Sequence, residues 1–375
     1  MAQTMVGVNS PMAVKRFSSS LTVDSARKGH WTRKWMAGGA TATRPVWTLP
    51  DLEKQRGQNI SFDISMQLNS RPIEGDDEAR GKGEKLFFYS QMVYIDQERE
   101  VVNVGGRMAQ KRTLHDLRQV ARARTADLWG RVFDQVIFMY LTGANSPGPN
   151  YQYVFETGWS GRAQNSITAP DSNHIVMGGV ATTPGSGGDL QTTDTMTTLP
   201  IDKAVAYAKM MGGGGPAYSE VPQIQPINLD GEEVFLCVMH PYQEFNLRRN
   251  TTSMDWADIQ KAITMATGKR NAFTDGSLGM WNKVVLQVHQ NVIAGNTYGA
   301  ASNVDWAGAL FCGVQAGTMA QGQPGGGLTF GWFEENYDGG NQLDIYTDTK
   351  WGFVKTTFNG NDFGVMVIYT AAKKP

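Results

Sequence analysis

The chain has 375 residues, an ordinary hydrophobic fraction of 41% and a formal net charge of −1, which excludes a disordered or strongly charged protein. Its length allows two or three lobes with buried cores. No run approaches the 18 or more apolar residues of a membrane span, and the first residues lack the apolar core of a signal peptide. We therefore expect a soluble protein that is made and used in a cytoplasm.

Residues 1–57 are predicted to be a basic N-terminal arm. Residues 1–50 carry seven basic side chains against Asp24 alone, a net charge of +6, so the remaining 325 residues sum to −7. Because the segment shows no sustained periodicity, we expect it to be extended and to meet a polyanion or an acidic neighbour. A solvated tail is the alternative, against which Trp31 and Trp35 argue. The basic residues are Lys15, Arg16, Arg27, Lys28, Arg33, Lys34 and Arg44.

Residues 58–106 are predicted to form a long β-hairpin. Apolar and polar side chains alternate from Asn59 to Ser70, a glycine-containing polar tip follows, and a second β-rich run returns from Leu86 to Asp96. Each strand would reach roughly 35 Å. A lone two-stranded ribbon is marginal in water, so we expect its apolar face to pack on another copy of the chain, with a larger sheet in its own domain as the alternative. The predicted contact residues are Ile60, Phe62, Ile64, Met66, Leu68, Phe88 and Tyr94.

Residues 113–142 carry the longest helical pattern in the chain. Apolar residues follow one another at spacings of three and four, Thr113 is placed to cap the first turn, and Gly143 marks the end. Such a helix would be about 45 Å long. Its apolar face consists of Leu114, Leu117, Ala121, Thr125, Leu128, Val132, Val136 and Met139. We expect the C-terminal strands of the same chain to cover that face and most of the helix arginines to be solvated.

The remaining chain divides into three predicted parts. Residues 143–199 indicate loops and short strands. Residues 200–320 alternate between strands and helices, which is typical of an α/β lobe; expected helices begin at 200, 242 and 256, and a strand near 310 would run into a small-residue helix. In residues 321–375, strands near 343–347, 351–358 and 363–370 are expected to pair with one another, with a hairpin turn at Asn359-Gly360-Asn361.

The residue patterns of catalytic and metal sites do not occur in the sequence. The five histidines, His30, His115, His174, His240 and His289, lack metal-ligand spacing, although His240 and His289 are expected in strands of one lobe. Gly212–Gly215 lacks the Lys-Ser/Thr of a phosphate loop, and the acidic hairpin tip lacks EF-hand spacing. Cys237 and Cys312 are expected to be buried free thiols. We predict no enzyme, no metal and no cofactor.

The order of these parts resembles a known family. The stretches that carry the resemblance are SFDISMQLNSRPIEGDD, FYSQMVYIDQEREVVNVGGRMAQKRT, VMHPYQEFNLRR, GALFCGVQAGTMAQG and WGFVKTTFNGNDFGVMVIYTAA. They are similar to the Hong Kong 97-type major capsid protein of tailed double-stranded DNA phages, and more specifically to the capsid family named after phage N-four. The resemblance implies an α+β capsid fold with an N-arm, an E-loop hairpin (58–106), a peripheral (P) domain with a spine helix (107–199 and 321–375) and an α/β axial (A) domain (200–320).

The resemblance also implies a structural function. Subunits would self-assemble into hexamers and pentamers of an icosahedral head, in which the E-loop lies over a neighbouring subunit. Implied partners are a scaffold protein, a portal protein, packaged double-stranded DNA bound without sequence specificity and a possible decoration protein, with no membrane. The implied location is the virion, after assembly in the host cytoplasm. The alternatives are a tail or other host-binding virion protein, and an enzyme built on the α/β lobe.

Overall fold

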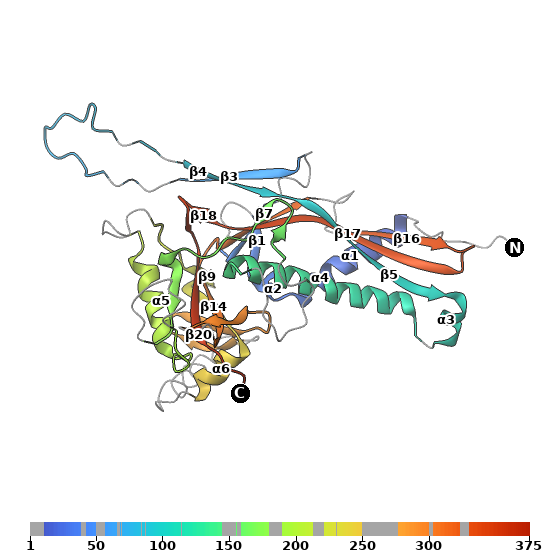
Figure 1. The fold of residues 1–375 in the computed structure, drawn as a ribbon. Coiled ribbons are helices and arrows are strands. Elements are labelled where there is room, and N and C mark those ends of the chain that lie inside the picture. Colours follow the sequence, from blue (N-terminus) through green and yellow to red (C-terminus); the bar gives the residue numbers. More distant parts are fainter. Residues whose placement is uncertain are drawn as a thin grey trace.

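Two β-sheets and one long helix organise the molecule (Figure 1). The computed structural model describes residues 11–38, 43–49, 57–65, 68, 70–83, 85–86, 88–113, 115–144, 155, 159–179, 190–212, 221–229, 231–249, 277–299, 303–322 and 330–375. A six-stranded sheet runs along the helix, and an eight-stranded sheet lies at one end of the molecule. Within the described residues, no helix is both long and apolar enough to cross a membrane.

The long helix α4 spans Leu117–Thr142, about 39 Å. Asp116, rather than the predicted Thr113, caps it by accepting the N–H groups of Arg118 and Gln119. Thr113 instead follows a separate short helix, α3 (Arg107–Arg112). The predicted end is confirmed, because Gly143 has a φ of 72° and its N–H donates to the Met139 carbonyl.

The face of α4 predicted to be apolar is only part of its buried surface. Ala121, Thr125, Val132, Val136 and Met139 are buried, Leu117 and Leu128 are half-buried, and Leu114 lies outside the described residues. From Val132 to Thr142 every side chain is buried, so this half of the helix has no solvated face. Strands β5 (Asp96–Gly106) and β17 (Gln342–Lys355) of the long sheet cover one side, and of these two only β17 is a C-terminal strand as expected. Two N-terminal helices cover another side.

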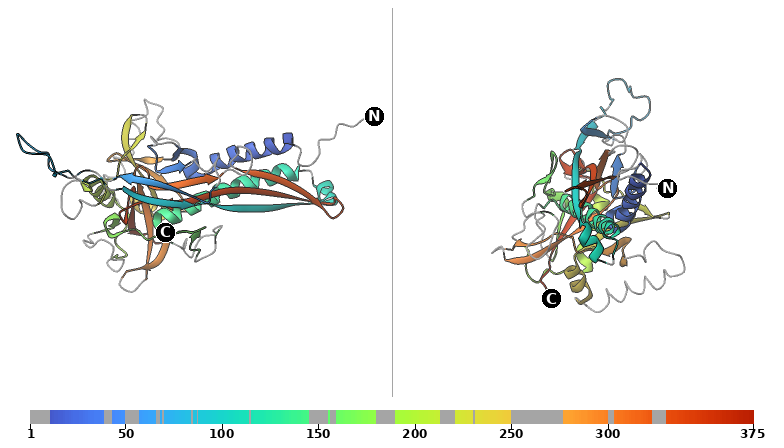
Figure 2. Two further views of the ribbon diagram at one scale, coloured as in Figure 1. Left: turned by 90° about the horizontal axis from the view of Figure 1, so that it is seen from above. Right: turned by 90° about the vertical axis from the view of Figure 1, so that its right-hand side faces the viewer.

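These N-terminal helices correct the prediction of an extended arm. Helix α1 (Pro11–Lys28) packs along α4, and α2 (His30–Lys34) follows it (Figure 2). Leu21 and Trp31 are fully buried, and each such side chain contributes about 1.5–3 kcal/mol through burial. The sequence did not indicate this helix because Pro11–Lys28 is rich in serine, threonine and charge and shows no sustained apolar periodicity. Gly130, the only glycine of α4, lets Gly29 approach closely.

The long sheet has the strand order β1-β2-β15-β17-β16, with β5 on the other edge of β17. Strand β17 pairs with β16 through its first half, with β15 through its second half, and with β5 along residues 342–351. It is therefore the central strand. The strands are β1 (Met36–Gly38), β2 (Val46–Leu49), β5 (Asp96–Gly106), β15 (Gly317–Gly322), β16 (Gly331–Tyr337) and β17 (Gln342–Lys355).

The hairpin is shorter than predicted. Strands β3 (Asn59–Ser65) and β4 (Phe88–Tyr94) pair with each other and reach about 23 Å each, not 35 Å. After Ile95 the chain enters β5, which pairs antiparallel with β17 and so belongs to the long sheet, not to the predicted hairpin of residues 58–106. The assignment failed because this partner strand lies about 240 residues further along the chain.

The eight-stranded sheet has the order β11-β12-β10-β14-β20-β8, with β13 on β14 and β9 on β10. The predicted helices at 200 and 242 are present as α5 (Thr198–Met210) and α6 (Pro241–Arg249), whereas the one expected from 256 lies outside the described residues. The strands are β8 (Ile175–Met177), β9 (Ile227–Leu229), β10 (Glu232–Met239), β11 (Ser277–Trp281), β12 (Val284–Val288), β13 (Ala294–Tyr298), β14 (Val304–Cys312) and β20 (Val365–Ala371).

This sheet changes the predicted limits of the α/β lobe. Strands β8 and β20 come from outside residues 200–320, and β15 replaces the helix expected after β14 and joins the long sheet. The C-terminal strands do not pair with one another: residues 343–347 and 351–355 belong to one strand, β17, while β20 pairs with β14 and β8. The turn at Asn359-Gly360 is confirmed, with φ values of 49° and 76° between β18 (Thr357–Phe358) and β19 (Asn361–Asp362).

Candidate assembly surfaces and buried polar sites

The hairpin β3–β4 has two different faces. Ile60, Phe62 and Ile64 share one face with Val93, and this face packs within its own chain against Leu49 and Ala320. The expectation that the alternating apolar residues need another subunit to cover them is therefore wrong for Phe62, which is buried in its own chain, whereas Ile60 and Ile64 are half-buried. Among the other predicted contact residues, Met66 lies outside the described part of the chain.

The opposite face of β4 is apolar and exposed. Phe88 and Met92 lie on it, together with the half-buried Tyr94, because their register partners are Ser65, Ser61 and Asn59. Phe88 is 64% exposed and Met92 is 51% exposed. Leu68 and Leu86, nearer the tip, are each 61% exposed. We call these four exposed side chains the hairpin patch. The loop that joins β3 to β4 projects beyond the body of the molecule (Figure 1).

Two side-chain amides hold the base of the hairpin. The Tyr94 N–H donates to Asn165 Oδ1 at 3.0 Å, and Asn165 Nδ2 donates to the Tyr94 carbonyl at 2.8 Å. Gln91 Nε2 donates to the Lys355 carbonyl at 2.8 Å, and the Thr357 N–H donates to Gln91 Oε1 at 3.0 Å. Each amide thus satisfies one backbone donor and one backbone acceptor of a strand end. Nothing in the local sequence signals these pairings.

Arg162 ties the same region to the start of β5. Its guanidinium donates to the carbonyls of Trp351 and Asp96, at 3.0 and 2.7 Å, and to Glu98 at 2.8 Å. The guanidinium carbon also lies 4.5 Å from the centre of a Trp351 ring, a cation–π contact. A buried arginine with this many partners fixes the point where the chain leaves the hairpin for the long sheet.

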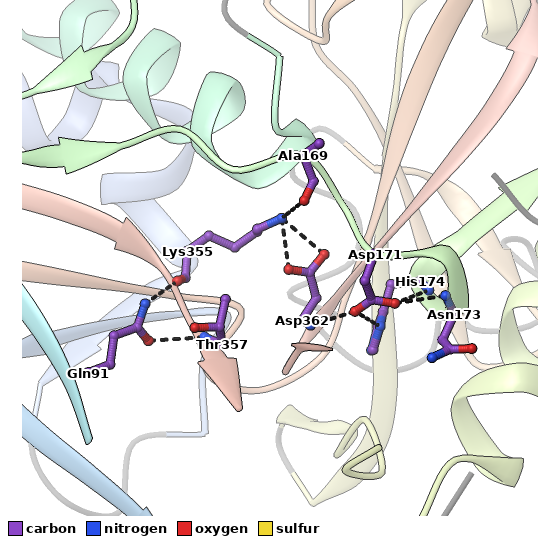
Figure 3. A network of polar contacts seen from close by, with 8 residues as sticks. All are labelled: Gln91, Ala169, Asp171, Asn173, His174, Lys355, Thr357 and Asp362. Carbon is purple, nitrogen blue, oxygen red and sulfur yellow. Dashed lines mark hydrogen bonds and ion pairs between the residues drawn. The ribbon is translucent and has the colours of Figure 1, made fainter. Parts of the chain in front are cut away.

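A second polar network lies under the turn β18–β19 (Figure 3). Lys355 Nζ contacts both carboxylate oxygens of Asp362, at 2.8 and 3.0 Å, and donates to the Ala169 carbonyl at 3.3 Å. Asp171 accepts the Asp362 N–H at 2.7 Å and lies 2.8 Å from His174 Nδ1. Burial raises the pKa of Asp362, and the Lys355 charge opposes that rise. A lysine within the apolar run WGFVKTTF was the one sequence signal for this pair.

The seven basic residues predicted for the N-terminal arm lie in different surroundings. Arg44 is half-buried and its carbonyl accepts the Gln315 N–H, while the side chains of Lys15 and Arg16 lie outside the described residues. The remaining four, Arg27, Lys28, Arg33 and Lys34, line one hollow with a volume of about 250 Å³ between the N-terminal helices and the end of β12.

An acidic residue on α4 positions this basic segment. Asp134 accepts the backbone N–H groups of His30 and Trp31, at 2.7 and 3.1 Å, and thereby caps α2. Burial raises the pKa of Asp134 to about 7, and the two backbone donors oppose the rise. His289 Nε2 lies 3.9 Å away, and the His289 ring stacks on Phe138. The Asp134 side chain itself is buried.

His240 and His289 do not form a joint site. They follow paired positions of β10 and β12, yet the His240 ring contacts Tyr242 while the His289 ring contacts His30 and Phe138. Burial lowers the pKa of both to about 4, so both are neutral at pH 7. Among the described residues, no group of three or more His, Cys, Asp or Glu side chains is placed to hold a metal ion. Cys237 and Cys312 are buried free thiols, as predicted.

These features, a projecting hairpin, a helix along a long sheet and a second sheet at one end, define a capsid-type architecture. A family model described as phage capsid protein matches residues 5–374, so the chain belongs to the phage capsid protein family. It is a structural protein of a phage capsid with the α+β fold of the Hong Kong 97 type, as the sequence motifs predicted.

Individual relatives agree with this assignment. The capsid of Ralstonia phage GP4 is 39% identical with a TM-score of 0.83, over 100% of this chain and 99% of that one. The capsid of cyanophage Pam1 is 18% identical with a TM-score of 0.67, over 93% and 94%, and shares the fold. The major capsid protein of Pseudomonas phage KPP25 is 23% identical over 361 residues, 89% of each chain.

Proposed function

We propose that this chain is the major capsid protein of a tailed phage, forming hexamers and pentamers of an icosahedral head around double-stranded DNA. The match to the Ralstonia phage GP4 capsid, 39% identical along the whole chain, is the observation that carries the proposal. A shell is built from many modest repeated contacts whose sum is large, and it needs no nucleophile. We propose accordingly that the chain has no catalytic role.

The hairpin patch supports an intersubunit role for β3–β4. Phe88 and Met92 are exposed on one face of β4, and exposed apolar side chains that gather on a surface mark interaction sites. The hairpin's other face packs on its own chain through Phe62 and Val93, so the patch of Leu68, Leu86, Phe88 and Met92 is the more exposed surface for a neighbour. We therefore limit the intersubunit part of the E-loop to residues 59–94, with the patch as its contact.

The proposed partners follow from the same function. A closed head needs a portal protein at the vertex where DNA enters and a scaffold protein during assembly in the host cytoplasm, and a decoration protein is a further candidate. The basic residues of the N-terminal helices suit contact with DNA phosphate. The domain limits become 11–49 for the N-terminal segment, 59–94 for the E-loop, the long sheet with α4 for the P domain, and the eight-stranded sheet for the A domain.

Electron microscopy of the purified chain, expressed alone and with the phage scaffold and portal genes, tests the proposal. We expect closed shells. A chain that stays monomeric under all of these conditions contradicts it. Replacing Asn59–Tyr94 by a short glycine-serine linker should leave a soluble, folded chain that does not close shells. Normal shells from this deletion would refute the intersubunit role of the hairpin but would leave the proposed capsid function intact.

A further inference from the structure

The turn between β18 and β19 exposes an asparagine that is followed by a glycine. Asn359 and Gly360 are both exposed, and their φ values of 49° and 76° are those of a left-handed two-residue hairpin turn. No other Asn-Gly pair occurs in the sequence. A Cβ atom placed on Gly360 would meet no heavy atom within 4 Å apart from its chain neighbours, so nothing shields the peptide bond between the two residues.

Neither the side-chain amide of Asn359 nor the Gly360 N–H is held by a hydrogen bond. Among the residues that the structure describes, none bonds to that amide and none accepts that N–H. The Asn361 amide donates only to the backbone carbonyl of Asn359, at 3.4 Å. Asn165, which precedes a serine in β7 (Asn165–Ser166), is the contrast, because both polar atoms of its amide bond to Tyr94.

The ladder that closes this turn is short. Strands β18 and β19 are joined by two residue pairs, and a two-stranded ribbon of that length is marginal by itself. Its base is held from outside, since the Thr357 N–H donates to Gln91 at 3.0 Å and the Asp362 N–H donates to Asp171 at 2.7 Å. The turn can therefore open locally while both of its ends stay in place.

We propose that Asn359 deamidates spontaneously by ring closure onto Gly360. Asparagine is one of the thermolabile residues of proteins, and a following glycine has no side chain to hinder the approach. The Gly360 nitrogen attacks Asn359 Cγ and closes a succinimide ring, and the side-chain NH2 leaves as ammonia with the proton of the Gly360 N–H. One water molecule then adds across either C–N bond of the ring.

Opening of the ring gives two products, and no group is oxidised or reduced. Aspartate keeps the normal backbone, whereas in isoaspartate the backbone runs through Cβ and Cγ of residue 359. Both products place a carboxylate on the exposed turn. The inference goes beyond the proposed function and does not depend on it, so its failure leaves that function untouched.

The isoaspartate product alters the support of the hairpin β3–β4. It adds one backbone carbon to the turn, and the length of a turn sets the register of the strands that it joins. Phe358, the residue before the turn, has its ring 4.9 Å from that of Tyr89 on β4, and Thr357 bonds to Gln91 on the same strand. We therefore expect chains that contain isoaspartate to hold β4 less firmly than newly made chains.

Peptide mass spectrometry of the folded chain, stored at neutral and at mildly alkaline pH in heavy-oxygen water, tests the proposal. The heavy oxygen marks conversion during storage and not during digestion. We expect the Asn359 peptide to become two separable acid products, with one ammonia released per converted chain. The rate should rise in proportion to hydroxide, because the attacking nitrogen loses its proton. Asn359→Gln, which must close a larger ring, should lose nearly all of the conversion, and the Asn165 peptide of the same digest should keep its amide.

Two results would overturn the proposal. If Asn359 keeps its amide in the folded chain but loses it in the denatured chain, the folded turn protects the pair. If Asn359 and Asn165 convert at equal rates, the reaction belongs to unfolded chains. For the hairpin, we expect faster amide hydrogen exchange from Phe88 to Tyr94 in isoaspartate chains than in Asn359→Asp, which carries the charge on a normal backbone. Equal exchange in these two chains would contradict the loosening of β4.

Discussion

Lys355 and Asp362 show how a single buried pair can control local stability. Lys355 is 1% exposed and Asp362 is 3% exposed, so each charge depends on the other for compensation. We expect Lys355→Met to lower the free energy of unfolding by about 3–5 kcal/mol, since it leaves the Asp362 carboxylate buried without its cation. Replacing both, Lys355→Met with Asp362→Leu, should restore most of the loss. Denaturant unfolding measures both changes.

An exposed pair provides the control for that experiment. Arg71 and Glu74 lie 3.3 Å apart, with side chains 84% and 78% exposed. Arg71→Ala should change the free energy of unfolding by no more than about 0.5 kcal/mol. A loss at Arg71 comparable to that at Lys355 would show that the buried environment is not the cause.

His240 gives stability a pH dependence of known sign. Burial lowers its pKa from 6.5 to about 4, so between these values the unfolded chain binds a proton that the folded chain does not. This contribution destabilises the fold as the pH falls from about 6.5 to about 4. We expect His240→Asn, which retains an acceptor for the Tyr242 N–H, to reduce the loss of unfolding free energy over this pH range by up to about 3 kcal/mol.

Denaturant unfolding of both chains across this pH range measures the effect of His240. Asp134 acts in the opposite sense, because its raised pKa of about 7 lets the folded chain hold a proton that the unfolded chain releases. It is present in both chains and cancels in the comparison. Parallel pH profiles for the two chains would contradict the assignment to His240.

At the scale of the element, the base of the hairpin depends on Asn165. Asn165→Leu leaves the N–H and the carbonyl of Tyr94 without their partner, and an unsatisfied buried group costs about 1–3 kcal/mol. We expect faster amide hydrogen exchange from Phe88 to Tyr94, with little change in α4. Asn103→Leu, at an exposed asparagine of β5, is the matched control. Unchanged hydrogen exchange in β4 would show that the Gln91 hydrogen bonds and side-chain packing are enough to hold the base of the hairpin.

Elements with local signals were predictable from sequence. The periodicity of α4, the alternation of β3, the strand β10 followed by α6 and the Asn359-Gly360 turn all depend on residues close in the chain, and all are present. The C-terminal strands β17 and β20 were predicted as strands but with wrong partners, because antiparallel pairing with β5 and β14 leaves no mark in the local pattern. Helix α1 was not predicted because its sequence, rich in serine, threonine and charge, has no sustained apolar periodicity.

The candidate sites, like the elements, were predictable only where they depend on residues close together in the chain. Phe88 and Tyr94 were named as contact residues, but the register of β3 and β4 puts them on the opposite face from Ile60 and Phe62. Sequence alternation fixes which residues of one strand share a face, whereas the face shared with the partner strand depends on register. The hollow joins residues 27–35 to residues 287–289, a contact that no spacing in the sequence could indicate.

At the scale of the whole molecule, the hairpin patch should decide assembly rather than folding. Phe88→Ser with Met92→Ser changes side chains that are 64% and 51% exposed, so we expect an unchanged free energy of unfolding within about 0.5 kcal/mol and a large loss of closed shells. Met108→Ser with Val120→Ser, exposed on α3 and α4, is the matched control and should assemble. Light scattering and electron microscopy score both variants. Full assembly of the patch variant would contradict its role.

The late position of β17 in the chain also orders events during synthesis. Strand β17 pairs with β5, β15 and β16, so the long sheet needs residues 342–355, whereas β20 is needed only to bring β8 into the eight-stranded sheet. When the ribosome has reached residue 341, β17 has not been made, and β5 and β16, which pair with it, must wait for it. An incomplete chain therefore lacks the long sheet, and we expect such a chain not to enter a growing shell.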